Sequence, residues 1–252
     1  MKPSPAAPKT QSSRRLRIWG ICLLVVILAG VGLALLLPLG KGGNKPAPTS
    51  SAKKRPDDTL VDTNLDSSEL ASGGLEALKQ DNPRKAIEFY KAAIATAPGQ
   101  ADLHYNLALA YVRLRDDPTA EGEFREALRI SPEYAEAHNN LGNLLLRLGR
   151  LTEAETHFKE ALRIQPDYAI AFNNLGIVYQ REKKQEKATS CFQNAVRCNT
   201  NYWQAQFNLA SSYLAQGDRA AGIAALKETL RINPSAAVAE RELAKLQAGP
   251  VR

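Results

Sequence analysis

Asparagine recurs at one fixed spacing along this chain. It stands at Asn106, Asn140, Asn174 and Asn208, each 34 residues after the last, and Asn139 and Asn173 precede two of them. A carboxamide carries both a hydrogen-bond donor and an acceptor, so it can pair with the N–H and C=O of a peptide backbone whatever the side chains are. A row of such groups would therefore bind an extended polypeptide.

A basic side chain follows three of these asparagines at a distance of seven residues. These residues are Arg113, Arg147 and Arg181. Seven residues are close to two turns of an α-helix, so each pair would share one helix face. We expect a groove that holds a peptide backbone and favours acidic side chains. The alternative is that both residue types serve only folding or solubility.

Residues for covalent, metal or cofactor chemistry form no comparable pattern. The motifs GxSxG, GxxxxGKS/T, GxGxxG and HExxH are absent, and the acidic residues are scattered. His104 and His138 recur at a position that we assign to packing. We therefore expect no enzymatic activity, no cofactor, no metal site and no small-molecule substrate.

The cysteines give no disulfide signal. Cys191 and Cys198 lie seven residues apart on one expected helix, about 10.5 Å of rise, which exceeds the Cα separation of a disulfide. Cys191 shares its repeat position with Glu123 and His157, so we expect it to be partly exposed. Cys198 replaces a recurring isoleucine, so we expect it to be buried.

The apolar residues keep the same 34-residue step. Small residues recur at Ala86, Ala120, Ala154 and Ala188, and aromatic rings follow at Tyr90, Phe124, Phe158 and Phe192. Leucine recurs at Leu107, Leu141, Leu175, Leu209 and Leu243. A fixed step of this length indicates stacked supersecondary units, which bury a continuous core only by packing on their neighbours.

One unit, residues 135–168, shows what each unit contains. Leucines at helical spacing predict a first helix over 135–148, and a second amphipathic stretch predicts a helix over 152–165. Thr152 would be the N-cap of the second helix, and Glu155 would complete a capping box.

These residues resemble the tetratricopeptide repeat. In the unit 135–168 the match comprises Leu141, Gly142, Leu145, Ala154, Phe158, Ala161 and Pro166. The resemblance covers residues 67–236 and implies an all-α fold, an α-solenoid of about five helix–turn–helix repeats. The repeats would be 67–100, 101–134, 135–168, 169–202 and 203–236, with a capping helix and tail over 237–252.

The resemblance also assigns a place to the asparagines. In this family the first helix of each repeat lines the inside of a superhelix. The recurring asparagines are similar to the asparagine ladder in the repeats attached to O-linked N-acetylglucosamine transferases, where side-chain amides hold an extended peptide. The resemblance thus implies a concave peptide-binding groove, with other proteins as partners.

The residues ahead of the repeats differ in composition. They form a basic tail over 1–17, an apolar run over 18–39 and a polar linker over 40–66. From Ile18 to Leu39 no residue is charged, and as a helix this run would span roughly 33 Å, enough to cross a bilayer. Trp19 stands at its entrance, where an interfacial ring is favoured. We expect a transmembrane helix followed by a disordered, flexible linker.

Basic residues suggest how this helix is oriented. Arg14, Arg15 and Arg17 directly precede it, which favours a cytoplasmic N-terminus and a single-pass protein whose repeats are extracytoplasmic, or periplasmic in a bacterium. The alternative is a cleaved signal peptide, whose apolar run is shorter and ends in a cleavage site.

The net charge of +7 is concentrated near the N-terminus. Residues 1–66 carry 10 Lys/Arg and 4 Asp, and residues 67–252 carry 23 basic and 22 acidic residues. Because nucleic-acid binding depends on excess positive charge on the folded domain, we expect no nucleic-acid partner.

Together these features predict a membrane-anchored scaffold or adaptor that binds other polypeptides during assembly of a membrane-associated complex. Two alternatives stay open. One is a non-catalytic accessory subunit of a protein O-glycosylation or envelope-biogenesis machinery. The other is a structural protein that self-associates as a homo-oligomer.

Overall fold

The described part of the chain is entirely helical. The computed structural model describes residues 61–62 and 65–248, all within one compact unit, Pro56–Arg252. Eleven α-helices follow one another there without a strand. They are α1 (Ser67–Lys79), α2 (Pro83–Thr96), α3 (Ala101–Leu114), α4 (Asp117–Ile130), α5 (Ala135–Arg147), α6 (Leu151–Ile164), α7 (Ala169–Arg181), α8 (Gln185–Cys198), α9 (Trp203–Ala215), α10 (Arg219–Ile232) and α11 (Ala237–Ala248).

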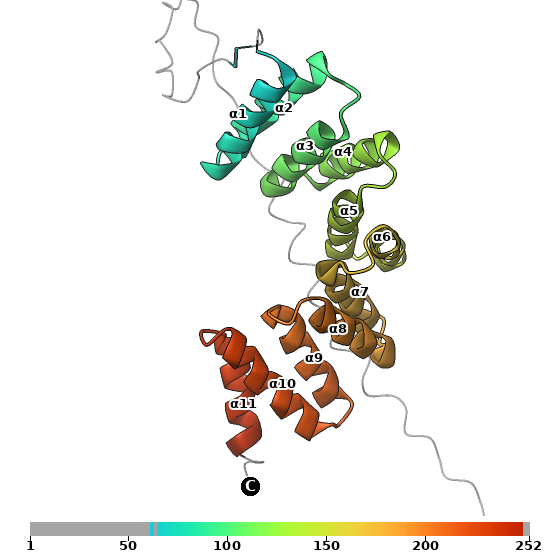
Figure 1. Ribbon diagram of the computed structural model, residues 1–252, viewed down its shortest axis with the longest axis vertical. Coiled ribbons are helices and arrows are strands. Elements are labelled where there is room, and N and C mark those ends of the chain that lie inside the picture. The colour runs from blue at the N-terminus through green and yellow to red at the C-terminus, as the bar shows by residue number, and fades with distance from the viewer. Residues whose placement is uncertain (1–60, 63–64, 249–252) are drawn as a thin grey trace, which may run out of the picture. The chain divides into compact units, whose positions relative to one another are not determined.

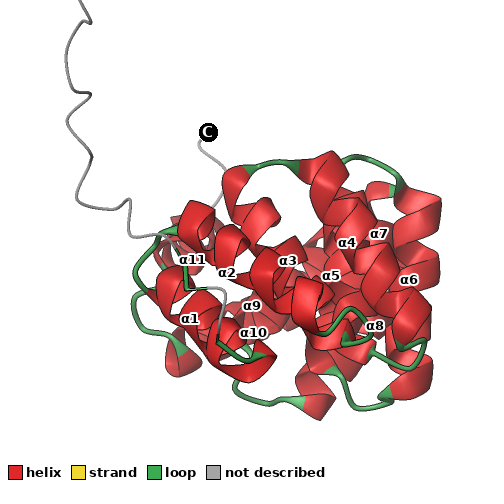
Figure 2. Cartoon of the chain, turned by 90° about the horizontal axis from the view of Figure 1, so that it is seen from above, coloured by secondary structure: helices red, strands yellow, loops and turns green. Residues whose placement is uncertain are grey.

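The first ten helices form five antiparallel hairpins, α1/α2 to α9/α10, and each hairpin packs on the next (Figure 1). Helix α11 packs on α10 and ends the stack. Figure 2 shows the same stack from above. The first helices of neighbouring repeats also touch, α1 with α3 and α5 with α7, so they lie on the inner side of the stack. This arrangement confirms the predicted solenoid of about five repeats with a cap.

The turn inside each hairpin requires one residue in the left-handed region. Gly149 and Gly217 adopt it with φ of 79° and 83°, and Asp81, Arg115 and Lys183 adopt it at the matching points of the other repeats. Glycine has no Cβ penalty at such a φ, whereas the other three residues bear a modest strain.

The prediction of a capping box at Thr152 is wrong. Helix α6 begins at Leu151, and its N-cap residue is Arg150, which makes no side-chain capping bond. The tight turn at Gly149 starts the helix earlier than the sequence signal suggested. In two other repeats the same N-cap position holds Asp116 or Asp218, whose carboxylate accepts a backbone N–H.

An aromatic ring seals the centre of each of the first four hairpins. Tyr90, Phe124, Phe158 and Phe192 are fully buried. Each ring lies against a small residue on the partner helix. A Cβ added to Gly142 would lie 2.8 Å from the Phe158 ring, and one added to Gly176 would lie 2.5 Å from Phe192. The recurring glycines therefore let paired helices approach closely.

The predicted transmembrane helix over 18–39 and almost all of the linker over 40–66 lie outside the described residues. Within the described residues, no helix combines the length and apolarity that a membrane span requires.

Candidate peptide-binding groove

The asparagines of the first helices form one chain of hydrogen bonds through the stack, which we call the asparagine ladder. Asn140 Nδ2 donates to Tyr105 Oη over 2.7 Å. Asn174 Nδ2 donates to Asn139 Oδ1 over 3.0 Å, and Asn208 Nδ2 donates to Asn173 Oδ1 over 2.8 Å. Longer contacts of 3.5 and 3.4 Å join the neighbours Asn139–Asn140 and Asn173–Asn174. The ladder thus connects four successive first helices.

Each bond of the ladder that crosses between repeats joins residues 35 apart, one repeat plus one position. A carboxamide therefore reaches the residue that precedes its counterpart in the previous repeat. For Asn106 that residue is Ala71, whose side chain has no acceptor. Asn106 consequently makes no side-chain hydrogen bond within the described residues and leaves its amide available.

Burial divides the predicted asparagines into two groups. Asn139, Asn173 and Asn174 are 3%, 4% and 8% exposed, so their side chains form hydrogen bonds within the stack and have little contact with solvent. Asn106, Asn140 and Asn208 are half-buried and can also present polar atoms to a ligand.

The three predicted arginines also contact the preceding repeat. Arg113 Nη1 donates to the carbonyl of Leu78 over 2.6 Å, and Arg181 Nη1 donates to the carbonyl of Leu146 over 2.8 Å. These carbonyls lie in the last turns of α1 and α5, and each also accepts a backbone N–H of the following turn, from Asp81 and Gly149 respectively. Arg147 instead pairs with Asp117 at the start of α4. The arginines therefore have structural partners, although Arg113 and Arg181 remain exposed.

The tyrosines at this surface were not among the predicted site residues. Tyr105 accepts the first bond of the asparagine ladder. Tyr134, Tyr168 and Tyr202 stand 34 residues apart and directly precede α5, α7 and α9. Their regular spacing was the signal that could have identified them.

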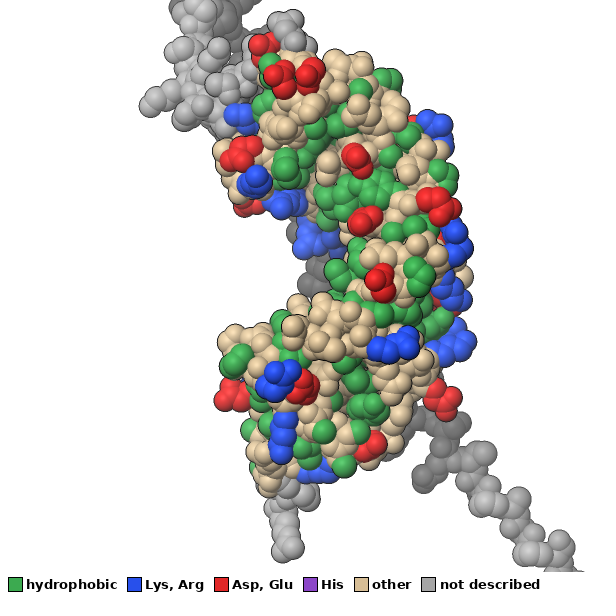
Figure 3. All heavy atoms as spheres, viewed as in Figure 1, with side chains coloured by type: hydrophobic (Ala, Val, Ile, Leu, Met, Phe, Trp, Pro, Cys, Tyr) green, Lys and Arg blue, Asp and Glu red, His purple; other side chains and the backbone are tan. Residues whose placement is uncertain are grey.

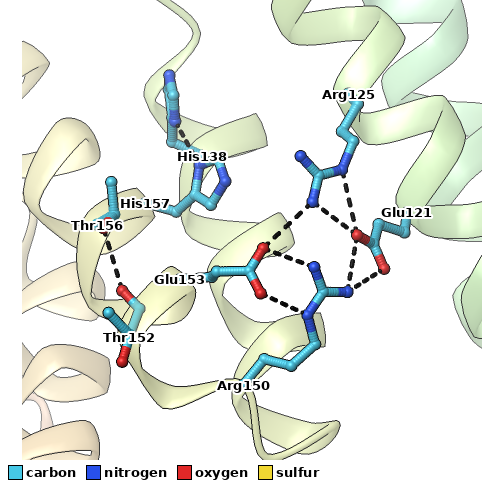
Figure 4. A network of polar contacts seen from close by, with 8 residues as sticks. All are labelled: Glu121, Arg125, His138, Arg150, Thr152, Glu153, Thr156 and His157. Carbon is cyan, nitrogen blue, oxygen red and sulfur yellow. Dashed lines mark hydrogen bonds and ion pairs between the residues drawn. The ribbon is translucent and has the colours of Figure 1, made fainter.

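A separate polar network lies on the second helices (Figure 4). Arg150 Nη1 donates to Glu121 over 2.7 Å, and Arg150 Nη2 donates to Glu153 over 2.6 Å. Arg125 also contacts both carboxylates, at 2.7 and 3.5 Å. The network links α4 with the start of α6, so it fastens repeats together outside the groove.

His138 and His157 lie beside this network and form a pair within one hairpin. Their Nδ1 atoms are 3.0 Å apart. Burial, followed by the neighbouring His138 and Arg125, lowers the pKa of His157 to about 4. Among the described residues, no group of three potential ligands could hold a metal ion.

Both cysteine expectations are wrong. Cys191 is buried, at 8% exposed, and Cys198 is only partly buried. Cys191 packs in the core beside Tyr179 and Phe192, and burial raises the pKa of its thiol to about 11. The expectation for Cys191 was based on the polar residues Glu123 and His157 at the matching positions of other repeats, and their exposure does not carry over to a small apolar thiol.

Two family models, both described as tetratricopeptide repeat, match the sequence. One covers residues 133–201, and the other covers 73–135 and 173–237. The chain belongs to the tetratricopeptide repeat (TPR) family. As a TPR protein it is a scaffold for protein–protein interaction, a class that is typically non-catalytic.

Solved TPR structures share the fold. PilF of Pseudomonas aeruginosa has a TM-score of 0.65 and 23% identity, over 72% of this chain and 87% of that one. MamA of Desulfovibrio magneticus RS-1 has a TM-score of 0.61 and 18% identity, over 70% and 98%. YrrB, described as a TPR protein with an unusual peptide-binding site, has a TM-score of 0.56 and 20% identity, over 69% and 89%. No curated protein matches the sequence.

Proposed function

We propose that this TPR protein is a membrane-anchored scaffold that binds extended segments of other polypeptides along its first helices. The observation that carries the proposal is the half-buried series Asn106, Asn140 and Asn208 on α3, α5 and α9. Each carboxamide can use polar atoms that the asparagine ladder leaves free to pair with a peptide backbone. Peptide binding by YrrB, as its description states, is consistent with this use of the fold.

Membrane attachment is the second part of the proposal, and it rests on sequence alone. The apolar run 18–39 would anchor the chain with a cytoplasmic N-terminus, and the linker would hold the repeats near the membrane on the extracytoplasmic side. Alkaline extraction of membranes tests the anchor. The full chain should stay in the pellet, and a chain without 18–39 should be released.

Site-specific photo-crosslinking tests the groove. A photoreactive amino acid at Asn106 lies on the first helix α3, and one at Gly122 lies exposed on the second helix α4 of the same repeat. In native membranes, position 106 should crosslink to partner polypeptides and position 122 should not. Equal crosslinking at both positions would place binding outside the groove.

The variant Asn106→Ala gives an independent test, because Asn106 has no side-chain partner among the described residues whose loss would disturb folding. In this variant the photoreactive amino acid is placed at a second groove position, 208. Its crosslinking to partners should fall relative to the parent, while the unfolding midpoint stays unchanged. Undiminished crosslinking would remove Asn106 from the site.

A further inference from the structure

A row of tyrosines runs along the beginning of the first helices. The tyrosine row comprises Tyr105, Tyr134, Tyr168 and Tyr202, all half-buried. Three of them precede α5, α7 and α9 directly, and Tyr105 lies near the start of α3. The 34-residue step therefore places Tyr134, Tyr168 and Tyr202 at one equivalent position in three successive units, and Tyr105 adds a second ring to the unit of Tyr134.

The tyrosine row is continuous with the asparagine ladder. The ring centroids of Tyr105 and Tyr134 are 4.9 Å apart, and Tyr105 accepts the hydrogen bond of Asn140. Burial first, and then the nearby Glu136 and the other tyrosines, raise the pKa of Tyr168 to about 12. The rings thus stay protonated at neutral pH and border the surface where we propose peptide binding.

The charges beside the tyrosine row are negative. Asp102 and Glu136 lie exposed in the first turns of α3 and α5, and neither forms an ion pair within the described residues. A pocket of roughly 330 Å³ lies between the start of α3 and the segment that precedes α5, and Asp102, Ser131 and Tyr134 are among its lining residues. In Figure 3, acidic side chains stand singly on a largely uncharged surface over this part of the stack.

The arginines of the first helices lie in the last turns of these helices, and each already has a bonding partner. Arg113 and Arg181 bind backbone carbonyls, and Arg147 pairs with Asp117. A ligand that reaches the tyrosine row therefore meets phenol rings and two exposed carboxylates, Asp102 and Glu136, that form no ion pair within the described residues. Lysine and arginine side chains suit both, through cation–π contacts and charge-assisted hydrogen bonds.

We propose that the tyrosine row, with Asp102 and Glu136, docks a cationic segment of a partner polypeptide. The inference rests on the proposed peptide-binding function and names the chemistry of its partner. Lysine or arginine side chains would lie over the rings and reach the two carboxylates, while the partner backbone would follow the asparagine ladder.

Fluorescence anisotropy with the full-length chain in detergent tests this selectivity. The probes are three labelled peptides of equal length that carry arginines, glutamates or only uncharged residues at the same positions. The arginine probe should bind most tightly at physiological salt. The double variant Asp102→Asn/Glu136→Gln should weaken it by about three- to tenfold, as expected for two partly exposed ion pairs.

A matched control separates local contacts from net charge. Glu88 and Glu186 are exposed on the second helices α2 and α8 and form no ion pair within the described residues. Glu88→Gln/Glu186→Gln changes the net charge equally and should leave the arginine probe unaffected. An equal loss in both double variants, or tighter binding of the glutamate probe, would overturn the proposal.

The uncharged probe distinguishes a failure of this proposal from a failure of the proposed peptide-binding function. If that probe binds and loses affinity in Asn106→Ala, the peptide-binding groove is supported even when charge selectivity fails.

The chain's own basic stretch, which includes Lys53, Lys54 and Arg55, is the competing occupant of the tyrosine row. Neutralising that stretch should not change the affinity for the arginine probe. A gain in affinity would mean that the stretch itself occupies the tyrosine row, which would contradict docking of a partner there.

Discussion

Asn174 on α7 donates its side-chain N–H to the side-chain oxygen of Asn139 on α5, across 3.0 Å and one repeat boundary. Both residues are more than nine-tenths buried. The pair therefore acts first as a link between repeats. In a stacked array each repeat depends on its interface with the next, so such a link contributes to the stability of the whole stack.

Replacing Asn174 by alanine should destabilise the protein. The change leaves the buried Asn139 oxygen without this donor, which costs about 1–3 kcal/mol. Asn106→Ala is the control, since Asn106 has no side-chain partner within the described residues, and it should change stability by less than about 0.5 kcal/mol. Urea unfolding followed by circular dichroism measures both, and equal midpoints would contradict the structural role of the ladder.

Gly142→Ala should also destabilise the protein, although alanine favours helix. The added Cβ would lie 2.8 Å from the Phe158 ring, which is fully buried and cannot move away freely. We expect a loss of about 1–3 kcal/mol from overpacking.

Gly122→Ala is the matched control for this prediction. Gly122 lies exposed within α4, and nothing lies within 4 Å of an added Cβ. This substitution should stabilise the protein by up to about 1 kcal/mol through helix propensity alone. Thermal unfolding should therefore shift in opposite directions for the two variants, and a shared direction would refute the packing argument.

His157 should make stability fall under mildly acidic conditions. Burial, His138 and Arg125 lower its pKa from 6.5 to about 4, and they outweigh the opposite effect of Glu153 and Glu160. Between these two values the unfolded chain binds a proton that the folded chain does not. Stability is therefore lost as the pH falls from about 6.5 towards 4, by at most about 1.4 kcal/mol per pH unit from this group.

The variant His157→Gln isolates that contribution. Its urea midpoint should vary less between pH 6.5 and 5 than that of the parent, while the difference between the two proteins stays constant from pH 7 to 8. Parallel curves through the acidic range would show that His157 does not titrate as described.

The two cysteines of the repeat array should differ in reactivity. Cys191 is buried and its thiol pKa is raised to about 11, so little reactive thiolate forms at neutral pH. Cys198 is partly exposed at the end of α8. Brief alkylation of the native protein followed by peptide mass spectrometry should label Cys198 first. Faster labelling of Cys191 would contradict its burial, and both should react fully after denaturation.

The periodic residues made the fold predictable, because the same kind of residue recurs at the same packing position in successive repeats. Phe158 and Gly142 recur in register with equivalent residues in other repeats, and their contact follows from helix pairing. Local features were harder to predict. The turn at Gly149, rather than the capping preference of Thr152, sets where α6 begins.

The sequence by itself determined the 34-residue unit, the paired helices and the face on which the asparagines recur, since helical periodicity fixes which residues share a face. Only the tertiary structure decided which atoms those asparagines use. The stack displaces neighbouring repeats so that Asn174 bonds to Asn139 rather than to Asn140. The same offset assigns Ala71 to Asn106, which makes no side-chain hydrogen bond within the part of the chain that the structure describes. That one-position offset depends on how whole hairpins pack, which no single helix encodes.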